Sequence, residues 1–371
     1  MTTSADRFTK MTVVATFFVI LLFPVVQMVT GLFHIPVLDE NRTRERAPTS
    51  TDLLKPVVFF SRSQKWFEDH YGFRDLLIRL KTQIDYSVFG VSDRVYIGVD
   101  GWLYYRNVID NQKPAEEAMA DAQLDAVVKK FSALGTELAA RNIKMIVITN
   151  QLKDKFYPEY LPYMVRGNRE HQRFDDFRAK MRLASGATYM DTTEVLTTLK
   201  TSRQIFHKTD FHWNDPAAAE VARLLVDKIA AFDGRKVPAW RYPLKIEVRK
   251  LSGDQALFLP LFSPPAEDAL FVDQRSRTMP SKEQQNAAPF ESIFSTPAKQ
   301  NDLLPTTVLY GDSFSDGMLR AGLSDHFGAL YRARRGEVKL SDVLEKMPAD
   351  TKYFVFQFIE VWLPGYVNGP L

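Results

Sequence analysis

Apolar residues along this 371-residue chain recur at two spacings, one typical of amphipathic helices and one typical of buried strands. Helical spacing occurs over 51–90, 121–141, 173–183, 194–200 and 215–232. Short apolar runs that indicate strands occur at 144–149, 305–310 and 353–359, and a hairpin is expected at 95–105. Helices that alternate with buried strands predict an α/β fold, with a mainly parallel sheet flanked by helices.

The N-terminal region predicts a membrane anchor. Met11 to Phe33 is a stretch of 23 residues without a charge, and roughly 20 apolar residues suffice to cross a bilayer. We expect a cytoplasmic n-region at 1–10, an uncleaved transmembrane signal-anchor at 11–33 and a linker at 34–50. A cleaved signal peptide is the alternative, because the n-region is basic and the strongest apolar run is short.

The remaining residues, 51–371, are expected to form one large domain. Residues 263–301 are rich in Pro, Ser, Gln and Ala. This composition predicts a long surface insertion in that domain.

The composition and motifs of the chain argue against several kinds of functional site. The chain has no cysteine, which excludes disulfides, thiolate metal sites and a cysteine nucleophile. Its net charge of +3, with both signs mixed, predicts no nucleic-acid-binding surface. A glycine-rich phosphate loop, an H-E-x-x-H pair and EF-hand spacing are absent from the sequence, so no cofactor and no metal are expected.

Two short motifs carry the candidate chemistry. Residues 209–215 read T-D-F-H-W-N-D, and residues 310–315 read Y-G-D-S-F-S. Ser313 follows a predicted strand, while Asp210 and His212 are two residues apart and share one face of an extended segment. A serine, a base and an orienting carboxylate are the groups needed for acyl transfer through a serine ester. The alternatives are a Gly-Asp turn with a capping serine and a core histidine tied to a turn aspartate.

Together these motifs resemble the SGNH-hydrolase-like domain of the AlgX/AlgJ family of alginate O-acetyltransferases. Four further segments match in the same order: Asp39–Arg42 (D-E-N-R), Phe67–Arg74, Val95–Tyr104 with G-V-D-G-W-L-Y, and Tyr157–Pro162 with Y-P-E. Ordinary SGNH esterases have the serine first and D-x-x-H last, which is the reverse of the order here. Two segments depart from the family: 150–153 reads N-Q-L-K in place of a P-P-K loop, and 359–361 reads I-E-V where Glu-Arg is usual.

The resemblance implies an O-acetyltransferase that acts on an acidic or neutral exopolysaccharide in the periplasm, anchored in the inner membrane. The acetyl group would come from a membrane-bound O-acyltransferase, beside other polymer-export components. A polysaccharide acetyl esterase and a non-catalytic polysaccharide-binding component remain alternatives, since transfer and hydrolysis share the acyl-serine.

Further residues are candidates for the pocket, each with a plainer reading. Asn150 is a candidate oxyanion donor or a turn residue, Lys153 a sugar-carboxylate contact or a solvated lysine, and Arg320 a weaker pocket candidate. The candidates for stacking on a sugar, or for ordinary core packing, are Trp102, Tyr104, Trp213 and Tyr310.

Overall fold

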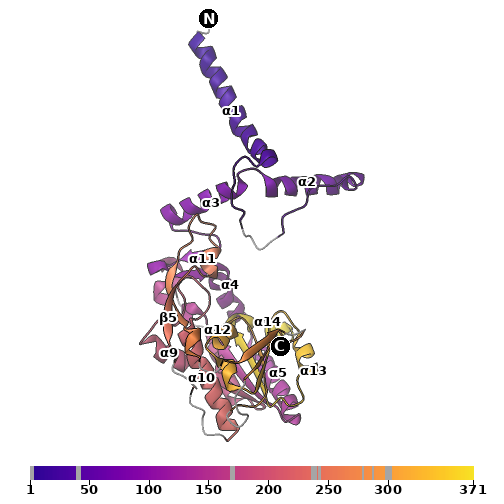
Figure 1. Ribbon diagram of the computed structural model, residues 1–371, viewed down its shortest axis with the longest axis vertical. Helices are drawn as coiled ribbons and strands as arrows, with labels where there is room; N and C mark the ends of the chain where they lie inside the picture. The colour runs from indigo at the N-terminus through magenta and orange to yellow at the C-terminus, as the bar shows by residue number, and fades with distance from the viewer. Residues whose placement is uncertain are drawn as a thin grey trace. The chain divides into compact units, whose positions relative to one another are not determined.

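The computed structural model describes residues 4–38, 43–167, 172–234, 240, 244–277, 280–285, 288–296 and 303–371. The chain divides into two compact units (Figure 1). The first unit comprises Met1–Ser92 and Leu259–Pro264, and the second comprises Asp93–Phe258 and Pro265–Leu371. The family segment at 39–42 lies outside the described residues.

The first unit is helical. Helix α1 spans Ser4–Thr30, and its stretch Arg7–Thr30, with a mean hydropathy of 2.4, is long and apolar enough to cross a membrane. The predicted helix at 51–90 is instead a short turn at Asp52–Leu54, helix α2 (Pro56–His70), helix α3 (Arg74–Ile84) and a π-helical turn at Asp85–Phe89. The break comes at Phe73, which adopts a positive φ of 69°.

The second unit is built on a seven-stranded sheet with the order β4-β3-β11-β9-β10-β8-β7. Its strands are β3 (Lys144–Asn150), β4 (Ala187–Asp191), β7 (Lys282–Gln285), β8 (Ser292–Ser295), β9 (Thr307–Gly311), β10 (Ala329–Arg334) and β11 (Tyr353–Ile359). The five strands from β4 to β10 are parallel, whereas β8 and β7 are antiparallel. The predicted α/β fold with a mainly parallel sheet is confirmed.

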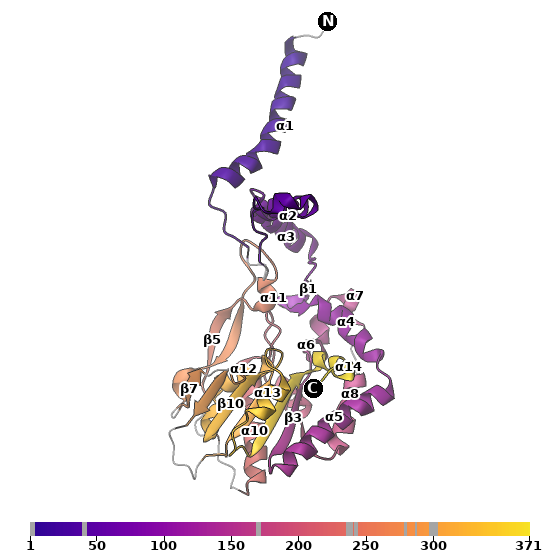
Figure 2. The same ribbon diagram turned by 90° about the vertical axis from the view of Figure 1, so that its right-hand side faces the viewer.

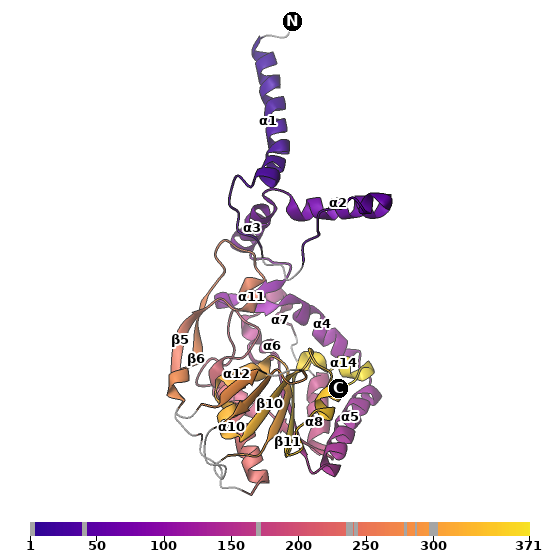
Figure 3. The same cartoon turned by 45° about the vertical axis from the view of Figure 1, so that its right-hand side comes forward.

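Helices cover both faces of this sheet (Figures 2 and 3). Alternate residues of β3 point to opposite sides, so Ile146 and Ile148 belong to one hydrophobic cluster and Val147 to the other. The long helices are α5 (Asp121–Ala140), α8 (Gln172–Leu183) and α10 (Asp215–Phe232). The shorter ones are α4 (Arg106–Glu117), α6 (Lys153–Phe156), α7 (Tyr163–Arg166), α9 (Thr193–Lys200), α11 (Asp254–Leu257), α12 (Phe314–Arg320), α13 (Leu340–Glu345) and α14 (Gly365–Asn368).

Two small antiparallel pairs complete the second unit. Strands β1 (Val95–Ile97) and β2 (Leu103–Tyr105) form the predicted hairpin, and β5 (Ile246–Leu251) pairs with β6 (Glu267–Val272).

The unit boundaries differ from the expected single domain at 51–371. Helices α2 and α3 group with α1, so the unit that holds the large sheet begins at Asp93. The segment 263–301, expected as a surface insertion, contributes strand β6 and the sheet strands β7 and β8. The sequence of β7, K-E-Q-Q, does not predict a strand, because its residues are polar and largely exposed.

Candidate active site

Ser313 lies in the turn between strand β9 and helix α12, at the carboxyl end of the sheet. Its side chain is exposed, and its Oγ lies 2.8 Å from Nε2 of His212. Ligand sites in open α/β sheets form at this end of the strands. The serine therefore occupies the position that suits a nucleophile in such a fold.

Asp312 holds the serine turn in place. Its buried carboxylate accepts hydrogen bonds from the backbone N–H of Phe314 at 3.0 Å, the backbone N–H of Ile359 at 2.7 Å and Nε2 of Gln357 at 3.0 Å. Burial raises the pKa of Asp312. Arg332 donates to the backbone carbonyls of Gly311 and Asp312. The turn is thus fixed from both neighbouring strands, β10 and β11.

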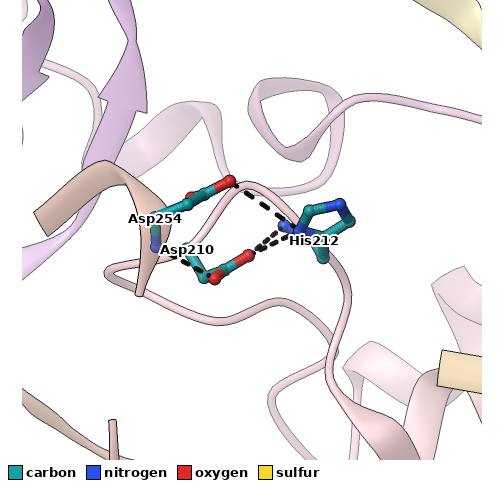
Figure 4. Close-up of side chains that lie close together, drawn as sticks. All are labelled: Asp210, His212 and Asp254. Carbon is teal, nitrogen blue, oxygen red and sulfur yellow. Dashed lines mark hydrogen bonds and ion pairs between the residues drawn. The ribbon is translucent and has the colours of Figure 1, made fainter. Parts of the chain in front are cut away.

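Asp210 and His212 lie in the loop that leads into helix α10. Nδ1 of His212 lies 2.7 Å from Oδ1 of Asp210, and the backbone N–H of His212 donates to the same oxygen at 2.9 Å (Figure 4). A bridge between Phe206 and Trp213 closes the loop, and Asn214 caps α10 by accepting from the N–H of Ala217. The sequence-predicted serine, histidine and aspartate therefore form one continuous chain of contacts.

The charges of this pair support each other. Burial alone would raise the pKa of Asp210, but its hydrogen bonds and its attraction to His212 outweigh burial and hold that pKa below the usual value. Burial alone would lower the pKa of His212, but Asp210 outweighs it and raises the pKa. An aspartate that stays ionised and a more basic imidazole are what a general base requires.

Asp254 is a second carboxylate beside this pair, which the sequence did not indicate. Its Oδ2 lies 3.9 Å from Nδ1 of His212, its Oδ1 accepts from the N–H of Phe211, and its own N–H donates to Asp210 (Figure 4). Burial and the nearby charge of Asp210 raise the pKa of Asp254. Gly253 allows this approach, because a Cβ there would collide with Asp210.

The same three side chains are of types that bind metal ions. Ligand atoms of Asp210, His212 and Asp254 lie within 4.8 Å of one another. However, Nδ1 of His212 already forms a hydrogen bond with Asp210, and Nε2 of His212 forms one with Ser313. This arrangement suits proton transfer better than metal binding.

Lys153 differs from its expected role as a sugar contact. Its side chain is buried, and Nζ donates to the backbone carbonyls of His207, Lys208 and Asp210 and to Oε1 of Gln255, at 2.6–3.3 Å. Burial lowers the pKa of Lys153 to about 7. The lysine supports the loop that carries the Asp–His pair, and it is inaccessible to a substrate.

Three of the four aromatic candidates differ from their expected role. Trp102 and Tyr104 are buried at 2 % and 1 % exposure, and the hydroxyl of Tyr104 donates to the carbonyl of Tyr157. Trp213 is equally buried, and its Nε1 donates to the carbonyl of Phe314. Tyr310 packs in the cluster on the opposite face of the sheet. The rings of Trp102, Tyr104 and Tyr310 are part of the core, whereas Trp213 is buried but still borders the cavity at Ser313 and His212.

Asn150 and Arg320 occupy different positions. Asn150 is buried and accepts from Gln357, which in turn donates to Asp312. It therefore supports the serine turn and does not line the cavity of about 290 Å³ that opens at Ser313 and His212. Arg320 does line that cavity, with a side chain 46 % exposed and paired to Asp215.

A cavity of about 290 Å³ opens at Ser313 and His212, with Leu251 and Phe271 as its apolar wall. His207 also lines it, and Nδ1 of His207 has no hydrogen-bond partner among the described residues. Burial lowers the pKa of His207, which favours a neutral imidazole. The cavity is small and polar on one side, and it can admit a short acyl group beside the serine.

Known proteins are similar to this chain in sequence. The family model described as "SGNH hydrolase-like domain, acetyltransferase AlgX" matches residues 95–345. The probable alginate O-acetylase AlgJ of Pseudomonas fluorescens is 26 % identical over 237 residues, which cover 61 % of this chain and 55 % of that protein. Its counterpart in Pseudomonas syringae pv. tomato is 25 % identical over 201 residues, which cover 53 % of this chain and 49 % of that protein. The chain thus spans about half the length of these curated relatives.

Two solved structures are similar to this chain at low identity. Bacillus cereus PatB1 is similar with a TM-score of 0.50 at 14 % identity, covering 73 % of this chain and 98 % of that one. The O-acetyltransferase domain of Pseudomonas putida AlgJ has a TM-score of 0.48 at 19 % identity, covering 73 % of this chain and 92 % of that one. The family model covers more than half of the sequence and includes both Asp210–His212 and Ser313. The chain therefore belongs to the family of the SGNH hydrolase-like domain of acetyltransferase AlgX.

Proposed function

We propose that this chain is an O-acetyltransferase that carries acetyl groups on Ser313 and transfers them to hydroxyls of an extracytoplasmic polysaccharide. The observation that carries this proposal is the continuous chain from Ser313 Oγ through His212 to Asp210, with contacts of 2.8 and 2.7 Å. The relatives named as probable alginate O-acetylases support the same reaction class.

The reaction proceeds in two halves. His212 Nε2 takes the proton of Ser313, and the serine oxygen attacks the carbonyl carbon of an acetyl donor. The donor's leaving group departs with the proton that His212 returns, which leaves an acetyl ester on the serine. A sugar hydroxyl then gives its proton to His212 and attacks the ester, and Ser313 regains a proton as the acetylated sugar departs. Asp210 stabilises the imidazolium in both halves.

In this proposal the acetyl group is passed across the inner membrane before it reaches Ser313. Helix α1 anchors the protein in the inner membrane, with the second unit in the periplasm, and a membrane-bound O-acyltransferase supplies the acetyl group. Anchoring would raise the effective concentration of Ser313 near that source. The apolar stretch Arg7–Thr30 supports this placement.

Intact-protein mass spectrometry after incubation with an activated acetyl ester tests the proposal. The wild-type chain should gain one acetyl group, and the Ser313→Ala variant should gain none. An adduct that survives Ser313→Ala would refute the role of the serine.

An esterase that removes acetyl groups is the second candidate, because water can attack the same ester that a sugar attacks. Deletion of the gene separates the two readings. Loss of O-acetyl groups from the secreted polymer, measured by NMR, supports transfer, and a gain of acetyl groups supports the esterase.

A further inference from the structure

Polar residues on one side of helix α3, in the first unit, are bound by the protein itself. Asp75 is buried, and it accepts hydrogen bonds from Arg44 at 2.6 Å and from the backbone N–H of Leu38 at 3.3 Å. Arg79 donates to the backbone carbonyl of Leu261 at 2.9 Å. A surface helix of a soluble protein shows the opposite arrangement, because its apolar side packs on the core and its polar side faces water.

The apolar side of α3 is exposed. Leu77, Leu80, Ile84 and Val88 are three or four residues apart, which places them in one stripe along α3 and the turn that follows it. Their exposed fractions are 51 %, 47 %, 44 % and 69 %. A run of exposed large apolar side chains marks a surface that contacts a partner or a membrane.

Helix α2 carries a second exposed apolar stripe. Val57, Phe60 and Phe67 are separated by three and seven residues, so they lie on one side of the helix, and all three are exposed. The two stripes belong to consecutive helices of the same compact unit.

Helix α1 contacts the break between α2 and α3. The ring centroids of Phe23 and Phe73 lie 5.2 Å apart, and the ring of Phe33 lies 6.0 Å from each. Gly72 permits this approach, because a Cβ there would collide with the backbone carbonyl of Pro24. Figure 1 shows α2 and α3 leading away to either side of the end of α1.

The position of this contact along α1 corresponds to a membrane surface. The helix from Arg7, the first residue of the apolar stretch, to Pro24 is ~25 Å long at ~1.5 Å per residue. The hydrocarbon core of a bilayer is ~30 Å thick. With α1 as the anchor, a segment that touches Pro24 therefore lies near the boundary between acyl chains and headgroups. Amphipathic helices at this boundary bury their apolar side by about 5–10 Å.

We propose that the exposed apolar stripes of α2 and α3 lie in the periplasmic leaflet of the phospholipid bilayer, beside the end of α1. The inference rests on the proposed membrane anchor and is independent of the chemistry at Ser313. Lipid is the partner because the stripes adjoin a helix with the length and hydropathy of a membrane span, at the depth of the membrane surface. A water-soluble partner would have to displace lipid to reach them. The two helices fix the depth of the first unit, which a single spanning helix with a free linker would not.

Single cysteines test this placement, because the chain has no native cysteine to label. Full-length Leu77→Cys and Phe60→Cys proteins carry a nitroxide label, in lipid nanodiscs that hold one protein each. Electron paramagnetic resonance compares collisions of the label with oxygen, which concentrates in lipid, and with a nickel chelate, which stays in water. The ratio of oxygen to nickel collisions should be several-fold higher at both positions than at two exposed control positions. The controls are Leu183→Cys at the end of α8 and Lys65→Cys on another side of α2.

Three results would overturn the proposal. The first is a label at Leu77 or Phe60 that meets the nickel chelate as often as the label at Leu183. The second is protection of these labels only in nanodiscs with two copies of the chain, or only in native membranes, because the stripes would then bind protein. The third is equal protection at Lys65, which would show that α2 is immersed on all sides.

A label at Ile20, within α1, separates this proposal from the anchor on which it rests. Lipid around Ile20 together with water around Leu77 would leave the anchor intact and refute the placement of α2 and α3. Water around Ile20 would refute the anchor and the placement together. Acetylation of Ser313 by an activated ester is measured on the same variants, and its failure would refute the transferase without changing the labels' accessibility.

Discussion

Replacement of Lys153 by methionine should change how the stability of the fold depends on pH. The ammonium is buried beneath the loop that carries Asp210 and His212, and it has four oxygen acceptors within 3.3 Å. Methionine is similar in length but donates no hydrogen bond. The variant therefore leaves buried carbonyls unpaired, and it also removes a group that is costly to charge in the folded protein.

The magnitude follows from the pKa of Lys153, which burial lowers from 10.5 to about 7. Each pKa unit corresponds to ~1.4 kcal/mol, so protonating this lysine costs ~5 kcal/mol more in the folded than in the unfolded protein. The unfolded chain binds more protons than the folded one between these pKa values, so the contribution to stability rises with pH. This contribution to the free energy of unfolding is therefore highest above the unfolded pKa, and it falls as the pH is lowered towards 7. The nearby carboxylates of Asp154, Asp210, Asp254 and Glu267 favour the charged form but do not cancel the effect of burial.

Denaturant unfolding of the wild-type and Lys153→Met proteins, at several pH values from about 7 to about 9, measures this effect. The free energy of unfolding of the wild type should rise by ~2 kcal/mol relative to the variant over that range. Curves that stay parallel would mean that Lys153 keeps an ordinary pKa, and the argument from burial would fail. At all these pH values the variant should also lose acetyl-ester turnover, because the loop behind Asp210 loses its donor.

Three further predictions concern the base and the anchor. Acetyl-ester turnover should fall as the pH drops through the raised pKa of His212. The Asp210→Asn variant should lower the rate by ~10⁴ and move the acid limb of the pH–rate profile to lower pH; an acid limb that does not move would contradict the pairing of Asp210 with His212. Asp254→Asn should shift the same limb in the same direction by less, with a modest loss of rate, since Asp254 also raises the pKa of His212; a loss as large as that of Asp210→Asn would make Asp254 the orienting carboxylate. Protease added to spheroplasts should digest the second unit, and high salt should not release the protein from membranes; a protected domain would contradict the periplasmic placement.

The parts of the site that sequence reasoning brought together are those encoded locally. Asp210 and His212 are two residues apart, and Ser313 follows a strand whose apolar pattern is unmistakable. Asp254 was missed because its place beside His212 depends on a distant loop and on a glycine that permits close approach. No periodicity along the chain reports such a contact.

Several pocket candidates lie outside the cavity for a related reason, although Arg320 and Trp213 do line it. The sequence leaves open whether Lys153 is solvated or contacts a sugar, and whether Trp102 stacks on a sugar or packs in the core; in the structure both are buried by segments remote in sequence. Burial of a polar side chain is decided by which carbonyls converge on it, and here those carbonyls come from residues more than fifty positions away. Strand β7 escaped prediction because a strand with little buried surface needs no apolar alternation.

The position of strand β11 has a consequence for the order in which this protein folds. It lies between β3 and β9, and it pairs Tyr353 with Lys144 and with Thr307. Because a chain is synthesised from its N-terminal end, this interior strand becomes available after all the other strands of the sheet. Pairings of such long sequence separation are slow to form. Ile359 and Gln357 of that strand donate hydrogen bonds to Asp312 in the turn that carries Ser313. A chain that still lacks β11 would therefore not order this turn, and we expect its serine not to be acetylated.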